Sequence, residues 1–414
     1  DKLYIMMLGA NPFPQPFTAP VVGLPGVPKQ LPQAPPTDEL KPKEASLPRY
    51  VNYLADYSGC GHWRILWPES VINARGEGMS QSTTAMVVDP RWYTGVKTVK
   101  VQRQASSQQK EFIKFLKQVQ QDHGFKIIYE VDDVVFKEVI PDYNKFKFAF
   151  DTEEVRQNCV DIINMVDEVT VTCEFMKRLY TEKTGKKEIT VIPNFVPNFW
   201  MGHLYNPRKV ERAFKKHKNR PRILYTGSGA HYDVDNKVDG NDDMSHVRDF
   251  IRKTVKKYQW VFVGAFPPQL VDLVQQREIE FYPWETLIRY PYLIASLDAQ
   301  LMVAPLQVND FNKSKSDIKF IEACTLGIPC LCQDMETYNS APDTLKFSTV
   351  DEFEDKINKI LAFKNKSSYY NNIRKLRSIG ERRLLEKDEN IRAYTESLNT
   401  PWGSDERVHL KRWN

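Results

Sequence analysis

Three charged side chains in the C-terminal third of the chain have the types and spacing of an anion site. Lys315 and Lys319 are four residues apart, so on a helix they share a face, and Glu322 follows three residues later. The polar loop that carries the lysines leads into an amphipathic segment that stops at Gly327-Ile-Pro329. Cations beside a helix N-terminus reinforce the attraction of the helix dipole for an anion. A carboxylate one turn further on accepts hydrogen bonds, so the stretch predicts a site for an anion that also carries hydroxyl groups.

Two glycine turns are candidates for bringing backbone amides to the same anion. Gly227-Ser228-Gly229 follows the first strand-like run of the second half, and its free amides are placed where a phosphate fits. Gly59-x-Gly61 lies in the first half and lacks the third glycine of a dinucleotide fingerprint. A Gly-Ser-Gly turn is common in proteins, and a match such as Gly59-x-Gly61 is more often an ordinary turn than a binding site.

Two acids, Asp132 and Asp133, end the strand-like run 126–131. Acids at the carboxyl end of a parallel strand face the ligand side of the sheet. There they can bind sugar hydroxyls, act as a base, or hold a metal with phosphate oxygens. Helix capping and a salt bridge with Lys137 are the structural alternatives. The pair does not have Asp-x-Asp spacing, so no metal site is predicted.

Length, charge and cysteine usage bound the class of protein. A chain of 414 residues is too long for one ordinary core, which predicts two domains, and the net charge of +5 permits an anionic partner without requiring one. The six cysteines form no Cys-x-x-Cys pair, which favours a reducing, cytoplasmic setting. We see no apolar run near the roughly 20 residues that span a bilayer, and no signal-peptide layout at the start.

Strand-like and helical patterns alternate along most of the chain, which predicts an α/β fold with parallel sheets. Expected strands are 3–8, 65–67, 84–88, 98–101, 126–131, 168–172 and 190–192, then 222–225, 260–263, 278–281, 299–303 and 329–332. Expected helices are 108–121, 153–166, 353–363 and 369–385. We expect a proline-rich strand and arm at 1–48, a Rossmann-like acceptor domain at 49–205 and a basic linker at 206–220. A Rossmann-like donor domain at 221–365 and C-terminal helices with a charged tail at 366–414 complete the expected order, with a cleft between the two domains.

The second half resembles the retaining glycosyltransferases of the GT-B fold, of the group-1 or family-4 type. The resemblance covers residues 225–332: the glycine turn, the strand 260–264, the segment 281–297, Ala304-Pro-Leu306, and the run Lys315-Ser316-x-x-Lys319-x-x-Glu322-Ala ending in Gly327-x-Pro329. The first half is similar more loosely, at Asp132-Asp133, 169–173 and Ile192-Pro-Asn194.

The resemblance implies transfer of a sugar from a nucleotide donor, most often a UDP-sugar, with retained configuration and with no obligatory metal or cofactor. Lys315, Ser316, Lys319, Glu322 and the turns Gly227-Ser228-Gly229 and Gly59-x-Gly61 would then bind the donor. Of these, Glu322 occupies the place of the family's ribose-binding acid. His62, Asp132 and Asp133 are the catalytic candidates, contacting the sugar or the acceptor. The chain departs from the family where a second acid is often found, because that position is Ser314.

The identity of the acceptor is harder to infer from the sequence than that of the donor. The proline-rich arm, sparse glycine and many lysines and aromatics resemble bacteriophage glycosyltransferases, which implies double-stranded DNA with 5-hydroxymethylcytosine as acceptor and a glucose or arabinose donor. Lys97, Lys100 and Arg103 would line a DNA path, with Arg64 beside it. Trp63 would stack on a flipped base, and the alternative is a structural role in the hydrophobic core. The other hypotheses are a cell-envelope glycan or lipid acceptor, and a non-catalytic nucleotide- or DNA-binding protein.

Overall fold

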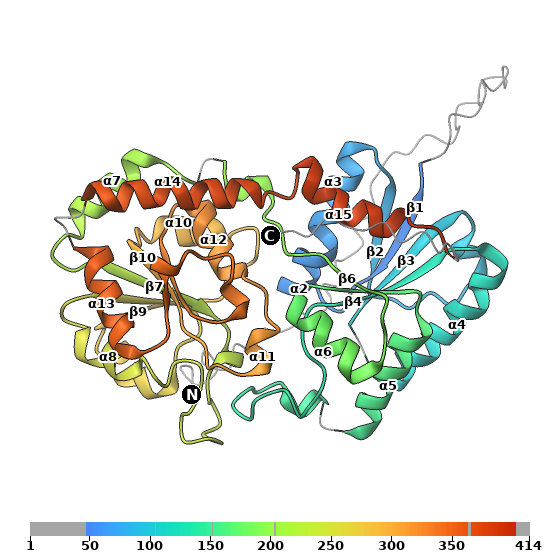
Figure 1. The fold of residues 1–414 in the computed structure, drawn as a ribbon, viewed down its shortest axis with the longest axis horizontal. Helices are drawn as coiled ribbons and strands as arrows, with labels where there is room; N and C mark the ends of the chain where they lie inside the picture. Colours follow the sequence, from blue (N-terminus) through green and yellow to red (C-terminus); the bar gives the residue numbers. More distant parts are fainter. Residues whose placement is uncertain (1–46, 104, 151, 203, 363–365, 403–414) are drawn as a thin grey trace, which may run out of the picture.

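The computed structural model describes residues 47–103, 105–150, 152–202, 204–362 and 366–402. They form two α/β halves that lie side by side (Figure 1). Each half is built on a six-stranded parallel sheet flanked by helices, which confirms the predicted fold class. The expected strand 3–8, nearly all of the proline-rich arm and the tail from residue 403 lie outside the described residues.

The N-terminal sheet has the strand order β2-β1-β3-β4-β5-β6. Its strands are β1 (Arg49–Tyr53), β2 (Met79–Thr83), β3 (Val96–Gln102), β4 (Lys126–Val131), β5 (Glu168–Val171) and β6 (Ile189–Val191). The helices of this half are α2 (Gly59–Gly61), α3 (Trp67–Arg75), α4 (Ser107–His123), α5 (Glu153–Met165) and α6 (Glu174–Thr184), and a short π-helix (His62–Leu66) joins α2 to α3. The order reverses between β1 and β3, and open α/β sheets bind ligands beyond the carboxyl ends of strands at such a switch point.

The C-terminal sheet has the order β12-β11-β10-β7-β8-β9, which is that of a Rossmann sheet. Its strands are β7 (Arg222–Gly227), β8 (Gln259–Gly264), β9 (Ile279–Pro283), β10 (Leu301–Ala304), β11 (Cys330–Gln333) and β12 (Lys346–Phe347). Its helices are α8 (Arg248–Thr254), α9 (Val271–Gln275), α10 (Tyr290–Ser296), α11 (Asp310–Lys313), α12 (Ile318–Leu326) and α13 (Val350–Leu361). The switch point lies between β7 and β10, so the loops after these two strands are the expected ligand loops.

The sequence specifies the ends of the helices that matter for the site. Helix α4 begins with a capping box, in which the Ser106 side chain accepts from the Gln109 amide and the Gln109 side chain accepts from the Ser106 amide. Helix α12 ends at Gly327, whose φ of 69° is in the left-handed region that glycine enters without strain. A Cβ at Gly327 would also lie 2.5 Å from the Tyr205 ring, so this end of the helix requires glycine for two reasons.

Two expected strands of the first half are wrong. Residues 65–67 belong to a continuous helical stretch from Gly59 to Arg75. The buried Trp63, Trp67 and Val71 follow one another at four-residue steps in it, which is the period of a helix. Residues 84–88 form a partly exposed loop, and the strand in this region is β2, an edge strand with the polar sequence MSQST.

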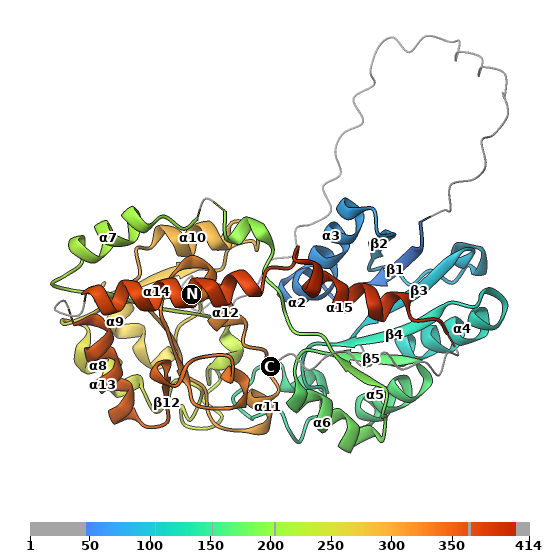
Figure 2. The same cartoon turned by 45° about the horizontal axis from the view of Figure 1, so that its top comes forward.

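Three helices outside the sheets tie the molecule together. Helix α7 (Pro207–Lys216) occupies the basic stretch expected to be a linker and buries Phe214 against Tyr369. Helix α14 (Lys366–Arg382) runs along α12, and the chain then crosses to the other half, where α15 (Asp388–Asn399) packs on α3 and β3 (Figures 1 and 2). The last helix therefore belongs to the packing of the N-terminal half, where the carbonyl of Leu398 accepts a hydrogen bond from Thr98 at 2.6 Å.

Candidate functional site

Lys319 and Glu322 lie on the first turns of α12, next to the loop that follows β7. The ammonium of Lys319 is 3.3 Å from Nε2 of His231 and 5.0 Å from the centre of the Tyr225 ring. A carboxylate oxygen of Glu322 accepts a hydrogen bond from the hydroxyl of Tyr290 at 3.3 Å. Lys315 precedes α12, so the expectation that both lysines share one helical face is wrong, and its ammonium lies 4.2 Å from the centre of the Phe311 ring.

Burial opposes charge on both Lys319 and Glu322. Desolvation lowers the pKa of Lys319 to about 8, and the positive charge of Lys315 adds to this effect. Desolvation raises the pKa of Glu322 to about 8, against the attraction of Lys319. A cation and an acid held this far from their ordinary pKa values at a sheet's switch point are typical of a binding site rather than of a surface ion pair.

His231 is a neutral ring that is held in place by a buried acid. Its Nδ1 lies 2.8 Å from Oδ2 of Asp243, whose side chain is 1% exposed. Burial and the nearby charge of Lys319 lower the pKa of His231 to about 4. The neutral ring therefore donates from Nδ1 to Asp243 and presents the lone pair of Nε2 to the Lys319 ammonium.

The glycine turn after β7 is tightly confined. A Cβ on Gly227 would lie 2.8 Å from the Tyr225 ring, so a larger residue does not fit there. The Ser228 side chain is exposed and accepts from the Ala230 amide at 3.3 Å, which caps the one-turn helix Gly229–His231. The sequence thus places this turn correctly at the end of β7, on the same side of the switch point as Lys319.

Two serines near the lysines have different roles. Ser316 accepts a hydrogen bond from the Asn194 side chain at 2.9 Å, which joins this loop to the first half. Ser314 is 1% exposed, and its hydroxyl donates to the Asp310 carbonyl at 2.7 Å. The position where the resemblance leads one to expect a second acid therefore holds a buried structural serine.

An aromatic side chain that the sequence did not single out covers the ends of β7 and β8. Trp284 follows β9, is 46% exposed and stacks on Tyr290, with ring centres 6.1 Å apart and planes inclined by 21°. Gly227 and Gly264 are paired neighbours in the sheet, and a Cβ on Gly264 would lie 2.9 Å from the Trp284 ring. Trp284 thus presents an accessible ring beside the glycine turn. The sequence feature that could have identified Trp284 is a large aromatic residue shortly after a strand-like run.

The acids of the first half follow β4, the strand next to β3 and one strand away from the switch point between β1 and β3. Asp132 forms a 2.5 Å ion pair with Arg103, and Arg103 also reaches Asp56 in the loop after β1 at 3.8 Å. Burial raises the pKa of Asp132, against the attraction of Arg103. Asp133 accepts from the Val134 amide at 2.9 Å, and no helix begins there in this described segment, so the alternative of helix capping is wrong.

The turn at Gly59 continues into helix α2 rather than into a strand. A Cβ on Gly61 would lie 1.9 Å from the Asp56 carbonyl oxygen, so Gly61 is needed for this close approach, while Gly59 has open space around it. Nδ1 of His62 is 2.9 Å from the Ser58 carbonyl, so this nitrogen donates and Nε2 is left as an acceptor.

Three of the five residues expected to contact acceptor or DNA are buried, so that assignment is wrong for them. Trp63 is packed between Trp67 and Trp200 in the hydrophobic core, which is the structural alternative given above. Arg64 is 1% and Lys100 is 2% exposed, and both are directed at the buried carboxylate of Glu130. Lys97 is exposed but donates to Asn399 of α15 at 2.9 Å, and Arg103 is partly exposed and paired with Asp132.

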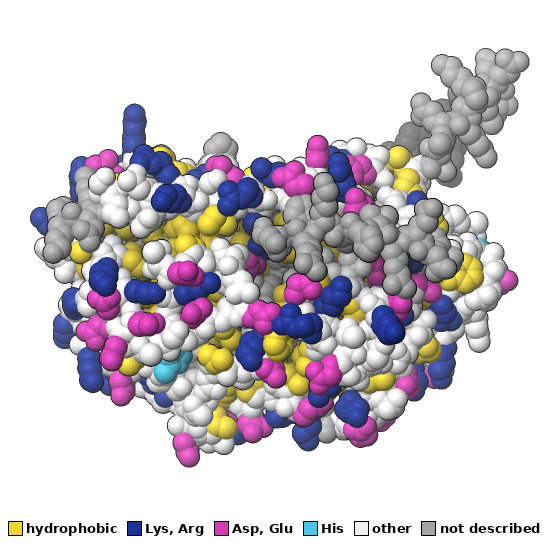
Figure 3. Space-filling view, in the orientation of Figure 1, with side chains coloured by type: hydrophobic (Ala, Val, Ile, Leu, Met, Phe, Trp, Pro, Cys, Tyr) yellow, Lys and Arg dark blue, Asp and Glu magenta, His cyan; other side chains and the backbone are white. Residues whose placement is uncertain are grey.

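The surface visible in Figure 3 carries lysines and arginines interspersed with acids over both halves. On this face no long basic stripe runs across the described residues. Among the described residues, every helix is too short or too polar to span a bilayer. In the same part of the chain no three His, Cys, Asp or Glu side chains converge on a metal-sized space.

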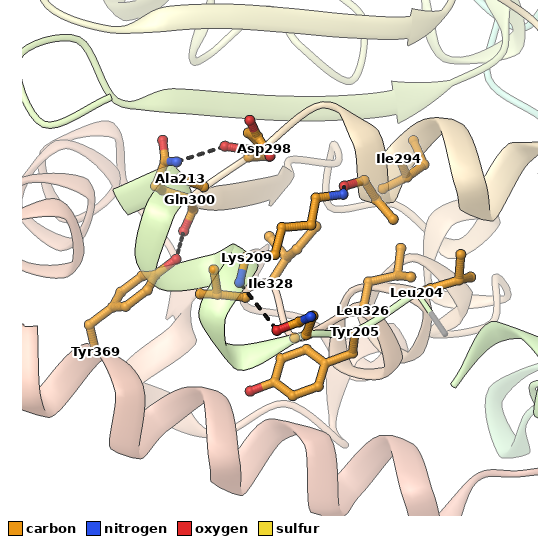
Figure 4. A pocket seen from close by; sticks show the side chains of 15 residues that line it. Leu204, Tyr205, Lys209, Ala213, Ile294, Asp298, Gln300, Leu326, Ile328 and Tyr369 are labelled. Atoms are coloured by element: carbon orange, nitrogen blue, oxygen red, sulfur yellow. Dashed lines mark hydrogen bonds between the residues drawn. The ribbon is translucent and has the colours of Figure 1, made fainter. Parts of the chain in front are cut away.

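Two cavities lie away from these residues. One of about 40 Å³ is enclosed by α7, α10 and α14, where Tyr369 donates to the Gln300 carbonyl at 2.8 Å (Figure 4). That volume is far below the several hundred Å³ of an ordinary ligand site. The other, of about 400 Å³, lies between α13 and α14 near Lys356 and Asn372. Neither is lined by the residues around Lys319.

No protein-family model and no curated protein matches the sequence. Solved structures match it in fold. Anabaena HepE in complex with UDP gives a TM-score of 0.57 at 10% identity, with 85% of this chain and 99% of HepE covered. A trehalose-6-phosphate protein from E. coli bound with UDP-2-fluoro glucose gives 0.52 at 8% identity, covering 85% and 100%. TarM gives 0.50 at 11% identity, covering 73% of this chain and 55% of TarM.

These likenesses and the two parallel sheets define the class of fold. The chain has the GT-B fold, in which two Rossmann-like domains stand with their ligand loops toward each other. The sequence resemblance predicted this fold, and the prediction is confirmed.

Proposed function

We propose that this chain is a glycosyltransferase that moves a sugar from a UDP-sugar to an acceptor hydroxyl. The observation that carries the proposal is the meeting of Lys319, Glu322 and the Gly227 turn at the β7/β10 switch point, with Lys315 close by. Solved proteins of the same fold were captured with UDP or a UDP-sugar, which supports UDP as the nucleotide. No metal or cofactor is required in this proposal.

Each group of the donor has a partner of suitable chemistry. Lys315, Lys319 and the amides of the Gly227 turn bind the diphosphate, because they supply positive charge and N–H donors. Glu322 binds the ribose hydroxyls, and its raised pKa makes it able to donate as well as accept. The accessible ring of Trp284 stacks on the uracil.

The chemistry that follows needs few protein groups. The lysines stabilise the negative charge that develops on the leaving diphosphate, in a partly buried place where such an interaction is strong. We propose retention of configuration, with the acceptor hydroxyl attacking the face that the diphosphate leaves. His62 is the base in this proposal, because its Nδ1 faces the Ser58 carbonyl and the Nε2 of the neutral ring is then an acceptor. Asp132 and Asp133 contribute to the acceptor side from the end of β4.

For the acceptor, we propose 5-hydroxymethylcytosine in double-stranded DNA, with a glucose or arabinose donor. Its support is the net charge of +5 together with the accessible Lys97 and the partly accessible Arg103. The burial of Trp63, Arg64 and Lys100 removes the base-stacking residue and two of the cations on which a DNA path rested.

The test is a transfer assay with labelled UDP-glucose and UDP-arabinose. Hydroxymethylated DNA, plain DNA and a mixture of lipid and glycan acceptors are offered in parallel. Label on hydroxymethylated DNA alone supports both proposals. Label only on lipid or glycan keeps the transferase and overturns the DNA acceptor. Absence of transfer and of donor hydrolysis, with UDP still bound, identifies a non-catalytic binding protein.

Site variants separate the donor site from the rest of the fold. Lys319→Ala and Glu322→Ala should each lower kcat/KM on the order of a hundredfold, as expected for loss of a group that stabilises developing charge or orients the donor. Lys313→Ala is the matched control, because Lys313 lies on neighbouring α11 and pairs with Asp310 at the surface. Unchanged transfer by the first two variants would overturn the assignment of the site.

A further inference from the structure

Two buried side chains cross the junction between the halves in opposite directions. Tyr143 belongs to the segment between β4 and α5 of the N-terminal half, and its hydroxyl donates to Oδ1 of Asp243 in the C-terminal half at 2.7 Å. Phe311 lies on α11 of the C-terminal half, and its ring is part of the N-terminal hydrophobic core. Tyr143 is 4% and Phe311 is 2% exposed, so each is enclosed when the halves are docked.

Tyr143 is connected to Lys319 through a continuous chain of polar contacts. Asp243 holds Tyr143 at one carboxylate oxygen and His231 at the other, at 2.7 and 2.8 Å. Nε2 of His231 then faces the Lys319 ammonium at 3.3 Å. Asn312 fixes the first part of this chain, because its side-chain amide donates to Asp243 at 2.6 Å and to the Tyr143 hydroxyl at 3.1 Å.

Phe311 contacts Lys315, the other lysine of the proposed donor site. The Lys315 ammonium lies over the Phe311 ring at 4.2 Å, a cation–π distance. Because the ring is fixed in the core of the opposite half, this contact places Lys315 relative to that half and not only to its own. The same loop is held by the Asn194–Ser316 hydrogen bond at 2.9 Å and by the Cys173 thiol, whose sulfur is 3.4 Å from the Ser314 carbonyl.

We propose that docking of the two halves through Tyr143 and Phe311 positions the two lysines that bind the diphosphate. The inference rests on the donor site of the proposed function and adds residues that do not touch the donor. Tyr143 is a positioning residue for Lys319 and Phe311 for Lys315. If the halves separate, Tyr143 leaves Asp243 and Phe311 leaves the N-terminal core. The groups beside the two cations, His231 and the Phe311 ring, then lose the contacts that fix them. Donor binding and the docked arrangement of the halves therefore favour each other, by linkage.

The first experiment measures the dissociation constant of UDP by titration calorimetry. Tyr143→Phe removes the hydroxyl and keeps the ring in place. It should weaken UDP binding by about five- to tenfold, the scale of one ordinary hydrogen bond, because Tyr143 acts on the donor site through other residues. Tyr50→Phe is the matched control, because Tyr50 is also a buried tyrosine whose hydroxyl donates, at 2.7 Å to Asn399, on the α15 side of the N-terminal half. It should leave the affinity for UDP unchanged.

The second experiment distinguishes positioning from a loss of structure. In a double-mutant cycle, Tyr143→Phe is combined with His231→Ala, which interrupts the chain before Lys319. The effect of Tyr143→Phe on UDP binding should then largely disappear. Additive losses, or an equal loss in Tyr50→Phe, would overturn the proposal. Phe311→Leu keeps an apolar side chain in the N-terminal core and removes the aromatic face. It should weaken UDP binding without lowering the unfolding temperature by more than a Phe112→Leu control in the same core.

The result for the wild-type protein keeps the two proposals separate. A wild-type protein that does not bind UDP contradicts the proposed function. A wild-type protein that binds UDP, with Tyr143→Phe and Phe311→Leu binding it equally well, contradicts only the positioning role.

Discussion

Arg64 and Glu130 form an ion pair of 2.7 Å in the middle of the N-terminal half, and both side chains are almost inaccessible to water. Arg64 also donates to the Ile192 carbonyl at 2.6 Å and to the Asn194 side chain at 2.9 Å. Since Asn194 donates in turn to Ser316, the pair anchors a connection between the N-terminal core and the loop of the donor lysines. The arginine that the sequence analysis placed beside a DNA path is therefore a structural residue.

Arg64→Met should destabilise the protein by about 3–5 kcal/mol, because it leaves the buried carboxylate of Glu130 with the Thr170 hydroxyl and with Lys100 at 4.0 Å in place of a direct ion pair. Urea unfolding followed by circular dichroism measures the change. Arg91→Met removes an arginine of an exposed pair with Asp89 and should change the unfolding midpoint little. A midpoint for Arg64→Met equal to that of Arg91→Met would contradict the role assigned to the buried pair.

Glu322→Gln should make the protein more stable at pH 8 than the wild type, and the advantage should vanish near pH 4. The folded-state pKa of Glu322 is raised from 4.5 to about 8 by burial, so its ionisation is disfavoured in the folded protein. Between these values the folded state holds a proton that the unfolded state has lost, and stability falls as pH rises. The difference reaches several kcal/mol, at about 1.4 kcal/mol per pKa unit.

Thermal unfolding of both proteins from pH 4 to pH 8 without nucleotide measures this difference. The comparison stops at pH 8 because Lys319, whose pKa is lowered to about 8, has a dependence of opposite sign above it. Glu381→Gln is the control, since Glu381 is exposed on α14. Parallel pH profiles for wild type and Glu322→Gln would show that burial does not raise the pKa of Glu322 in the folded protein.

Trp284→Ala should weaken UDP binding by roughly 1–3 kcal/mol, the contribution of one aromatic–base stack. Stability should change little, because the side chain is 46% exposed. Trp284→Phe should recover part of the affinity. Trp402→Ala, which removes another partly exposed tryptophan outside the donor site, is the control for calorimetry. Equal affinities for wild type and Trp284→Ala would place the base elsewhere.

The central strands could be predicted because a strand buried on both faces is a continuous apolar run. The predicted strand 126–131 coincides with β4, and the expected runs 222–225 and 260–263 fall within β7 and β8. The edge strand β2 could not be found this way, since Met79–Thr83 holds one apolar residue at its start. The strand expected at 65–67 is the opposite error, a helical segment predicted as a strand. Three consecutive apolar residues suggested a strand, but the apolar residues around them repeat with the period of a helix.

The lysines and the acid that we propose for the donor site could be selected from the sequence because they are close together and their spacing suggests the chemistry. Tyr143 could not be, because its role depends on Asp243, one hundred residues away. Trp63, Arg64 and Lys100 were misassigned because a sequence does not tell whether a charged or aromatic side chain points into the sheet's core or out of it. The partner that decided this, Glu130, lies 66 residues from Arg64.

UDP affinity should fall as pH rises through about 8, because Lys319 loses its proton there and with it the charge that attracts the diphosphate. Asp243 and Glu322 act against this loss and Lys315 promotes it. Lys319→Arg should remove the dependence and keep most of the affinity, since a guanidinium stays charged throughout. Lys319→Gln should bind weakly at every pH between 7 and 9. Calorimetric titrations over that range measure the profiles, and a wild-type affinity as flat as that of Lys319→Arg would show that Lys319 keeps its proton or does not contact the nucleotide.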